Sequence, residues 1–247
     1  MSRVLVLMYH QVDSPRSPQE QRFCTPPTDF DAQMRHLVDA GYRGVSLDEV
    51  RAHVAGERSL PGPSVHVSFD DGFVGVLEHA WPTLKALGLP ATLFAVAGRT
   101  GDTNDWMHGR GFPRRALLSA SQLRLLADEG MAIGSHTSHH VRLTDVDAEV
   151  ARQEIGTSRQ ALQDLLGREV THFAYPYGKF TPALRDMVQA AGYRCACSTR
   201  AGFNRSGEDP FLIRRLDIAG TDRPWAFRQK LRMGTHEGTC WRPLAYY

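Results

Sequence analysis

Strand-like and helix-like segments alternate along almost the whole chain of 247 residues, and this alternation limits the fold more than any other feature. Apolar runs of strand length occupy residues 3–9, 64–69, 90–97, 131–135, 171–176, 193–198 and 211–218. Segments with helical periodicity occupy 30–41, 47–56, 76–88, 119–130, 147–167, 181–192 and 223–234. Several helical segments end in the glycine that commonly terminates a helix, and Ser119 with Gln122 predicts a capping box. Without a low-complexity linker, this order predicts a single (β/α) barrel-like domain.

The overall composition and the N-terminal segment bear on the expected partners and on location. Lys and Arg together number 29 and Asp and Glu 27, so the net charge of +2 gives no reason to expect nucleic acid or an anionic membrane surface. The opening MSRVLVLMYHQ is too short for the apolar core of a signal peptide and for a transmembrane segment. We therefore expect a cytoplasmic protein. We interpret the four cysteines, at 24, 195, 197 and 240, as reduced structural thiols, because they show no CxxC spacing.

Two polar clusters directly follow apolar runs. In SFDDGF, residues 68–73, Asp70 and Asp71 are adjacent, and neighbouring carboxylates are kept in a fold only with a compensating cation or a catalytic use. In GSHTSHH, residues 134–140, one helical turn would point His136 and His140 the same way. His139 is a weaker candidate ligand, because it is three residues from His136.

Together these clusters predict a metal site. Strand ends meet at the mouth of a βα barrel, so one aspartate could join His136 and His140 on a divalent cation, leaving positions open for water and substrate. The second aspartate could then stay ionised as a base. Taken alone, each motif has a plainer interpretation, since HxxxH is often a solvated histidine pair and DDG a turn.

Two further segments could contribute to the same mouth. In FAYPYGKF, residues 173–180, Pro176 fixes a turn whose free backbone N–H could face a developing oxyanion, although the turn could equally just end a strand. In MYHQV, residues 8–12, His10 ends the first strand, where a structural core histidine is the alternative. Gly- and Pro-rich loops at 13–27, 98–115 and 199–210 would wall such a site.

SFDDGF, SHTSHH and AYPYG, in this order and spacing, resemble the first three motifs of the carbohydrate esterase family 4 polysaccharide deacetylases, which share the NodB-homology domain. The similarity extends from about residue 4 to about residue 220. MYHQV followed by FDAQMRHLVDAGYRGVSL is similar to the branch that contains the poly-N-acetylglucosamine deacetylases, in which the motif order is circularly permuted. The lack of a late LxH motif is consistent with this permutation.

The resemblance implies a distorted (β/α)7-type barrel forming one catalytic domain over residues 1–247, with 221–247 as a C-terminal helix and tail. It implies a hydrolase that removes N-acetyl groups from N-acetylglucosamine-type sugars in a polysaccharide, an oligosaccharide or a glycoconjugate. By the same resemblance Asp70 is the general base, His10 the general acid and the Tyr177 backbone N–H an oxyanion donor. The implied metal is zinc, with cobalt or nickel as alternatives, and its implied ligands are Asp71, His136 and His140.

The chain departs from the family pattern in two places. Ala174 stands where many members have an arginine that orients the base, and we expect Arg214 or Arg215 to reach the same carboxylate from a later strand. The fourth motif, an aspartate near a tryptophan, has no clear match after Tyr193.

Three alternatives remain open from the sequence. An O-acetyl esterase of the same family would use the same residues. A non-haem Fe(II) oxygenase also uses two histidines and a carboxylate. A sugar-binding protein with a decayed site would keep only part of the catalytic set. Because we expect a cytoplasmic protein, a sugar precursor, a lipid-linked sugar and a short oligosaccharide have the same weight as a polymer.

Overall fold

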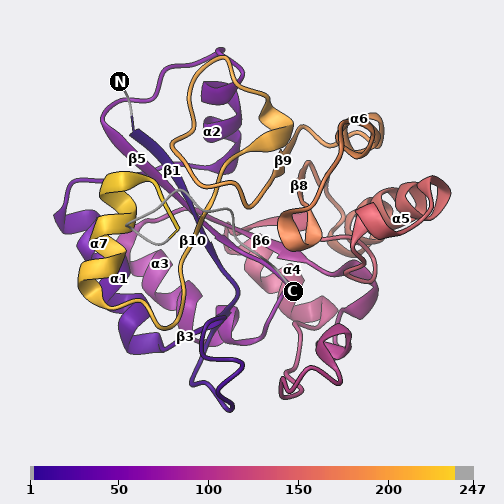
Figure 1. Ribbon diagram of the computed structural model, residues 1–247, viewed down its shortest axis with the longest axis horizontal. Coiled ribbons are helices and arrows are strands. Elements are labelled where there is room, and N and C mark those ends of the chain that lie inside the picture. Colours follow the sequence, from indigo (N-terminus) through magenta and orange to yellow (C-terminus); the bar gives the residue numbers. More distant parts are fainter. Residues whose placement is uncertain (1–2, 237–247) are drawn as a thin grey trace.

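In the computed structural model, which describes residues 3–236, the seven apolar runs form strands of one curled, parallel β-sheet surrounded by helices (Figure 1). The sheet has the order β10-β1-β5-β6-β7-β8-β9, and the short β4 pairs with β5. The strands are β1 (Arg3–Tyr9), β4 (Arg43–Gly44), β5 (Pro63–Phe69), β6 (Ala91–Ala95), β7 (Ala132–Ser135), β8 (His172–Ala174), β9 (Cys195–Cys197) and β10 (Leu216–Asp217). Beside this sheet, β2 (Gln11–Val12) pairs with β3 (Cys24–Thr25).

The register of the sheet brings the strand ends together. β1 and β5 are paired along their whole length, from Arg3 opposite Pro63 to Tyr9 opposite Phe69, so both strands end at the same level. At the other side of the sheet, Ile213 forms a parallel bridge with Cys197 just before the chain enters β10. This bridge links β9 to the segment that pairs with β1, and the sheet curls into the distorted barrel that the sequence predicts.

Helices cover the outside of the sheet. They are α1 (Pro27–Asp39), α2 (Leu47–Val54), α3 (Trp81–Leu87), α4 (Ala120–Asp128), α5 (Ala148–Leu166), α6 (Pro182–Ala190) and α7 (Pro224–Met233). The predicted capping box is present, because Ser119 Oγ accepts from the Gln122 backbone N–H and the Gln122 side chain accepts from the Ser119 N–H. Figure 1 shows α1 and α7 on one flank of the sheet and α5 and α6 on the other.

The predicted helix over 76–88 has two parts. A π-helical turn, η1 (Val76–Ala80), precedes α3, whose second residue is Pro82. Proline has no N–H to donate to the carbonyl four residues back, so the α-helical hydrogen-bond ladder is interrupted there. Short 3₁₀ turns occur in the loops, as η2 (Ala97–Arg99), η3 (Asp105–Met107), η4 (Leu143–Asp145), η5 (Pro176–Gly178) and η6 (Pro210–Leu212).

Alternate residues of β1 face two apolar clusters. Leu5 and Leu7 join the large core between the sheet and its helices, whereas Val4 and Val6 face a second cluster that includes Phe94 and residues of α2. The second cluster also holds Cys195 and Cys197, which with Cys24 are free and buried, as expected for structural thiols. Cys240 and the part of the predicted C-terminal helix and tail (221–247) that begins at residue 237 lie outside the described residues.

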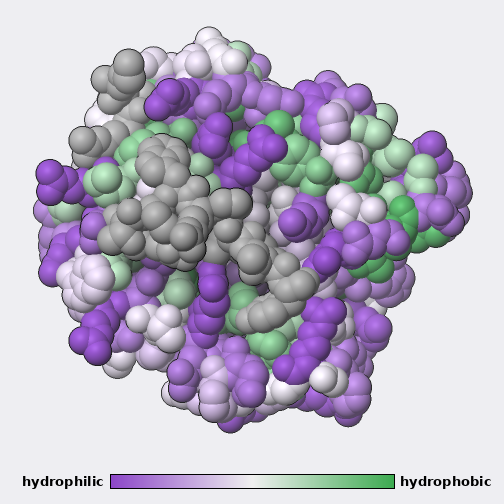
Figure 2. Space-filling view, viewed as in Figure 1, coloured by the Kyte–Doolittle hydropathy of each residue, from purple (hydrophilic) through white to green (hydrophobic). Residues whose placement is uncertain are grey.

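Among the residues that Figure 2 colours by hydropathy, hydrophilic ones predominate and apolar ones occur in separate patches. This distribution agrees with an apolar core held between the sheet and the helices. Within residues 3–236, no helix combines the length and the apolar character that a membrane crossing requires.

Candidate metal and catalytic site

Four parallel strands end at one edge of the sheet, and the predicted site residues follow them directly. His10 follows β1, Asp70 and Asp71 follow β5, and His136 follows β7. The loop after β8 carries Tyr177. Parallel strands present their carboxyl ends at the same edge, so residues far apart in the sequence meet here. All five line one cleft.

Asp71, His136 and His140 converge on a common point. Asp71 Oδ1 lies 3.2 Å from His140 Nε2 and 3.7 Å from His136 Nε2, and all three residues are buried. Although two imidazole nitrogens face it, the buried Asp71 Oδ1 has no hydrogen-bond partner among the described residues. Two imidazole nitrogens and a carboxylate oxygen arranged in this way are suited to binding a divalent cation.

The ring of His136 is set up to be a ligand. Its Nδ1–H donates to the Ala174 carbonyl at 2.8 Å, which leaves the lone pair of Nε2 toward Asp71. Burial lowers the pKa of His136 to about 4, so the imidazole is neutral at pH 7. Ala174 stands where many family members have an arginine, and its backbone carbonyl orients the His136 ring.

The segment from His136 to His140 is a loop, so the predicted helical turn between the two histidines is wrong. Thr137 and His140 have left-handed backbone conformations, with φ of 67° and 57°, and Thr137 Oγ1 accepts from the His140 N–H at 3.0 Å. The buried Glu154 of α5 accepts hydrogen bonds from the N–H groups of Ser138 and His139. These bonds hold the loop so that both ligand rings face Asp71.

His139 lies outside the metal cluster. Its side chain is 56% exposed, and its Nδ1 lies 2.7 Å from Glu154 Oε1. Among the described residues, the group of donor atoms that could hold an ion consists of Asp71, His136 and His140.

Asp70 is held by Arg215. The guanidinium donates from both terminal nitrogens to the two carboxylate oxygens, at 2.6 and 2.8 Å, and the Arg215 side chain is fully buried. Burial raises the pKa of Asp70, but the charge of Arg215 and its hydrogen bonds to the carboxylate outweigh this effect and keep the pKa below its usual value. Arg214, the other expected candidate, bonds to the Ala201 carbonyl and lies 3.6 Å from Glu208.

His10 and Tyr177 also line the cleft. The ring of His10 packs edge-on against Phe23 with 5.3 Å between centroids. Tyr177 adopts a left-handed conformation, with φ of 58°, directly after Pro176, and its ring packs 4.7 Å from that of His140. The structure thus brings both residues to the metal cluster, while their chemical roles remain predictions.

Residues of all three predicted wall loops line the cleft, which opens to solvent. They include Glu20 and Phe23 from the first loop, Trp106, Arg110 and Phe112 from the second, and Thr199 from the third. The buried Arg115 donates to Glu20 and Asp13 at 2.6 and 2.7 Å, which ties the first wall to the second.

Sequence reasoning missed several residues of the site. Glu154 could have been noticed, because it occupies a core-facing position of α5 between Ala151 and Ile155. Trp106, whose ring stacks on His140 at 4.8 Å, and Arg115 come from an irregular loop without a periodic pattern. Their contacts depend on pairing between distant segments, which no local signal reveals.

Comparisons with known proteins found similarity in both sequence and fold. The sequence profile described as "Polysaccharide deacetylase" matches residues 57–196, more than half of the chain. The chain is 21% identical over 212 residues to poly-β-1,6-N-acetyl-D-glucosamine N-deacetylase of Staphylococcus aureus (strain MRSA252), covering 82% of this chain and 70% of that protein.

Two solved structures share the fold. Streptococcus pyogenes deacetylase PplD, solved in complex with acetate, has a TM-score of 0.79 and 24% identity, covering 93% of this chain and 98% of that one. IcaB from Ammonifex degensii has a TM-score of 0.77 and 28% identity, covering 95% and 97%. The single curled α/β domain is therefore one that known deacetylases have.

Proposed function

The chain belongs to the polysaccharide deacetylase family, and we propose that it is a metal-dependent hydrolase that removes N-acetyl groups from N-acetylglucosamine-type sugars. One observation carries this proposal. A second ionised carboxylate, Asp70, is fixed by Arg215 beside the metal cluster, with one oxygen 3.9 Å from His136 Nε2. A site that only bound a metal would need no such carboxylate.

The metal ligands and Asp70 have different roles in the proposed reaction. A divalent cation on Asp71, His136 and His140, which we propose to be zinc, would polarise the acyl carbonyl and make water more acidic. Asp70 takes a proton from the attacking water, because Arg215 keeps the carboxylate ionised and fixes its direction.

Two further residues act on the reacting group. The Tyr177 backbone N–H stabilises the negative charge that develops on the carbonyl oxygen. His10 gives a proton to the leaving amine, because an amine is expelled slowly as an anion. The position of His10 after the first strand supports membership of the circularly permuted branch that contains the poly-N-acetylglucosamine deacetylases.

Family membership favours this activity over a non-haem oxygenase or a decayed binding protein. An O-acetyl esterase of the same family would use the same residues, so the choice between amide and ester rests on the substrate. The similarity to a protein named for N-deacetylation of poly-β-1,6-N-acetyl-D-glucosamine supports the amide. We further propose that the protein acts in the cytoplasm, where a sugar precursor, a lipid-linked sugar and a short oligosaccharide have the same weight as a polymer.

Acetate release tests the proposal. Zinc-loaded protein is incubated with β-1,4- and β-1,6-linked N-acetylglucosamine oligomers, nucleotide-linked N-acetyl sugars and acetylated xylan, and Asp70→Asn is the matched control. We expect acetate from at least one N-acetyl sugar and none from the variant. Release from acetylated xylan alone would make the protein an esterase. Release that persists in Asp70→Asn would remove Asp70 as the base.

A further inference from the structure

The two ligand histidines are held in different ways. His136 donates its Nδ1–H to the Ala174 carbonyl, which fixes the orientation of its ring. The Nδ1 of His140 is buried and, among the described residues, has no hydrogen-bond partner. Metal-binding histidines usually depend on such a hydrogen bond for the direction of the ring. Contacts of another kind must therefore orient the His140 imidazole.

Aromatic rings enclose the imidazole of His140. The Trp106 indole stacks on it, with 4.8 Å between ring centres and only 20° between ring planes. The Tyr177 ring meets it edge to face, at 4.7 Å and 69°. Stacked and edge-to-face pairs at these separations are the favourable arrangements of aromatic side chains. The ring of His140 is thus held by packing, and Trp106 covers one of its two faces.

Hydrogen bonds within the loop over 98–115 fix the position of Trp106. The buried side chain of Asn104 accepts from the Arg115 N–H at 2.8 Å and donates to the Pro113 carbonyl at 3.3 Å. The Asn104 backbone N–H also donates to the Arg115 carbonyl at 3.2 Å. The two sides of the loop are therefore joined two residues before Trp106. A loop fixed in this way can hold the indole against the ligand ring.

An indole face also favours the metal-bound state of the ring. When His140 Nε2 binds a cation, the imidazole loses electron density and carries part of the positive charge. Aromatic faces attract positive charge, and tryptophan has the strongest such face among the side chains. Trp106 is only half-buried, but the face that it presents to His140 is shielded from water by the stacking itself.

A platform for a sugar ring is the other role that a tryptophan in this cleft could have. One face of Trp106 is already occupied by His140, so a sugar could contact only the opposite face or the edge. The two roles have different consequences. A platform contributes to substrate binding, whereas support of a ligand contributes to metal binding even when no substrate is present.

We propose, on the basis of the proposed function, that Trp106 is a positioning residue that holds the His140 imidazole in the direction in which Nε2 binds the metal. Removing the indole would keep all three ligands but would let the ring of His140 turn. Loss of an outer partner of a metal ligand typically weakens metal affinity about 10- to 100-fold. We expect the lower end of this range, because packing is less directional than a hydrogen bond.

Zinc affinity tests the proposal without any substrate. The dissociation constant is measured by competition with a chelating indicator, for the unmodified protein and two variants of Trp106. Trp106→Leu should weaken zinc binding about tenfold, because leucine fills part of the space but has no aromatic face. Trp106→Phe keeps a stacking face and should remain within about threefold of the unmodified protein.

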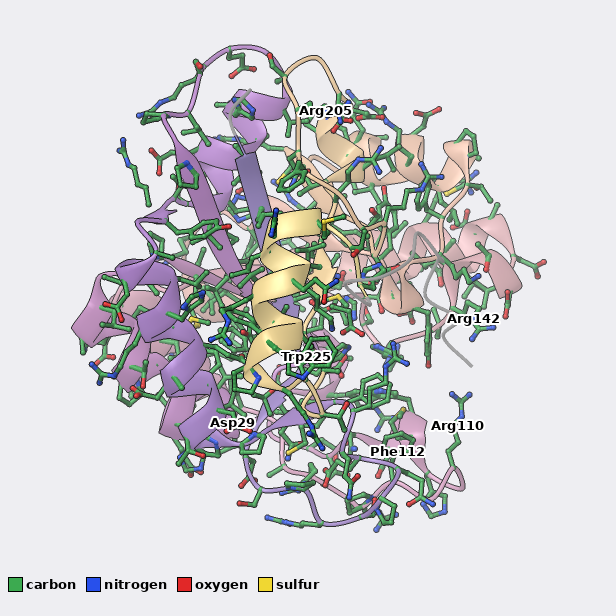
Figure 3. All side chains as sticks on the ribbon, turned by 60° about the vertical axis from the view of Figure 1, so that its left-hand side comes forward. Asp29, Arg110, Phe112, Arg142, Arg205 and Trp225 are labelled. Atoms are coloured by element: carbon green, nitrogen blue, oxygen red, sulfur yellow. The ribbon has the colours of Figure 1, made fainter. Side chains whose placement is uncertain are left out.

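Two further substitutions are matched controls. Phe112→Leu makes a similar change in the same loop, but the Phe112 ring packs on Phe23, with 5.8 Å between ring centres. Trp225→Leu removes an indole that is 56% exposed on α7. Figure 3 shows both residues, Trp225 on α7 and Phe112 near Arg110. Neither control should change zinc affinity. Urea unfolding of the metal-free proteins checks that every variant, Trp106→Leu included, is folded.

Cobalt reports on the direction of the ligands. The visible absorption of bound Co²⁺ depends on how the ligand atoms are arranged around the ion. At saturating cobalt, Trp106→Leu should have shifted and weaker bands, whereas Phe112→Leu should have the spectrum of the unmodified protein. A general loss of stability would lower the melting temperature without changing the spectrum of the saturated protein.

Turnover at saturating zinc separates the two roles of the tryptophan. A displaced ligand should lower kcat, whereas loss of a sugar platform would raise KM at unchanged zinc affinity. Unchanged zinc affinity in Trp106→Leu would overturn the proposal, and so would an equal loss in either control. A loss in Trp106→Phe as large as that in Trp106→Leu would show that stacking is not the cause, which would also overturn it.

The proposed function can fail separately. Weaker zinc binding in Trp106→Leu, together with no acetate release by the unmodified protein from any glycan, would retain the role of Trp106 and reject the deacetylase. Acetate release with unchanged zinc affinity in Trp106→Leu would do the reverse. An unmodified protein that bound neither zinc nor cobalt would reject both.

Discussion

At the scale of single residues, backbone strain is concentrated at the metal site. Within residues 3–236, the non-glycine residues with positive φ are Asp71, Thr137, His140 and Tyr177. Left-handed conformations cost roughly 1–2 kcal/mol per residue, and they persist where the surrounding structure holds them. The residue types of the ligands could be predicted from the sequence, but these conformations could not. This explains why a helical turn was predicted between His136 and His140 where the structure has a loop.

The role of His10 leads to a prediction about leaving groups. If His10 protonates the departing amine, His10→Ala should lower kcat for amide substrates by about 10²- to 10⁴-fold and change KM little. Hydrolysis of p-nitrophenyl acetate should be nearly unaffected, because that leaving group departs without a proton. Asp70→Asn, the control, should lose both activities. Equal losses on the amide and the ester in His10→Ala would mean that His10 supports the site in another way.

Arg215 and its neighbour Arg214 give a matched pair of variants. Arg215→Met leaves the Asp70 carboxylate buried without its partner, which should lower the free energy of unfolding by about 3–5 kcal/mol. Arg214→Met should cost no more than about 1 kcal/mol, because its pairing with Glu208 is partly exposed. Urea unfolding of metal-free protein measures both.

The double variant Arg215→Met with Asp70→Asn separates the ion pair from general packing. It should be clearly less destabilised than the sum of its two single changes, because it leaves no unpaired buried charge. Additive losses would show that Arg215 contributes packing alone.

At the scale of elements, the sequence predicts strands and helices well but not how the barrel closes. Each apolar run contains an observed strand, because continuous apolar segments are buried on both faces of a parallel sheet. The predicted strand over 211–218 is reduced to Leu216–Asp217. Ile213 bonds instead with β9, and Leu216 pairs with β1. One short segment thus changes partners, and such nonlocal pairing leaves no periodic signal.

The central strand β5 contains a histidine that should make folding sensitive to acid. His66 is buried, with Nδ1 2.8 Å from the Val45 carbonyl and Nε2 3.0 Å from Thr92 Oγ1. Nδ1 must donate to the carbonyl, so neutral Nε2 accepts from the hydroxyl. Burial lowers the pKa of His66 to about 4 from the ordinary 6.5.

The unfolded chain therefore binds the proton more readily than the folded chain, and stability present above pH 6.5 is lost as the pH falls toward 4. The loss from this group amounts to about 3 kcal/mol. His66→Gln should be less stable at pH 7 but should lose correspondingly less stability on acidification, as urea unfolding at pH 7 and pH 4.5 can measure. Identical pH slopes for the two proteins would assign the acid sensitivity to other groups.

At the scale of the whole molecule, the site exists only when the barrel has formed. Its residues extend from His10, directly after the first strand, to Arg215, directly before the last, and the ends of several different strands place them. Local sequence could predict which residues belong to the site, because all strand ends share one edge. It could not predict which wall each loop forms. A ligand of the assembled site should consequently bind the folded chain alone.

Metal binding should therefore stabilise the entire fold. At a free zinc concentration one hundred times the dissociation constant, the expected gain is about 2.7 kcal/mol, which for a chain of this size raises the melting temperature by roughly 5–10 °C. A chelator should reverse the rise. His136→Ala should abolish it, whereas His139→Ala should retain it, because the exposed His139 lies outside the ligand cluster. Asp70→Asn should also retain it, since Asp70 pairs with Arg215. If His139→Ala lost the rise while His136→Ala kept it, the metal would lie elsewhere. The proposed roles of Asp71 as a metal ligand and Asp70 as the base would then be wrong.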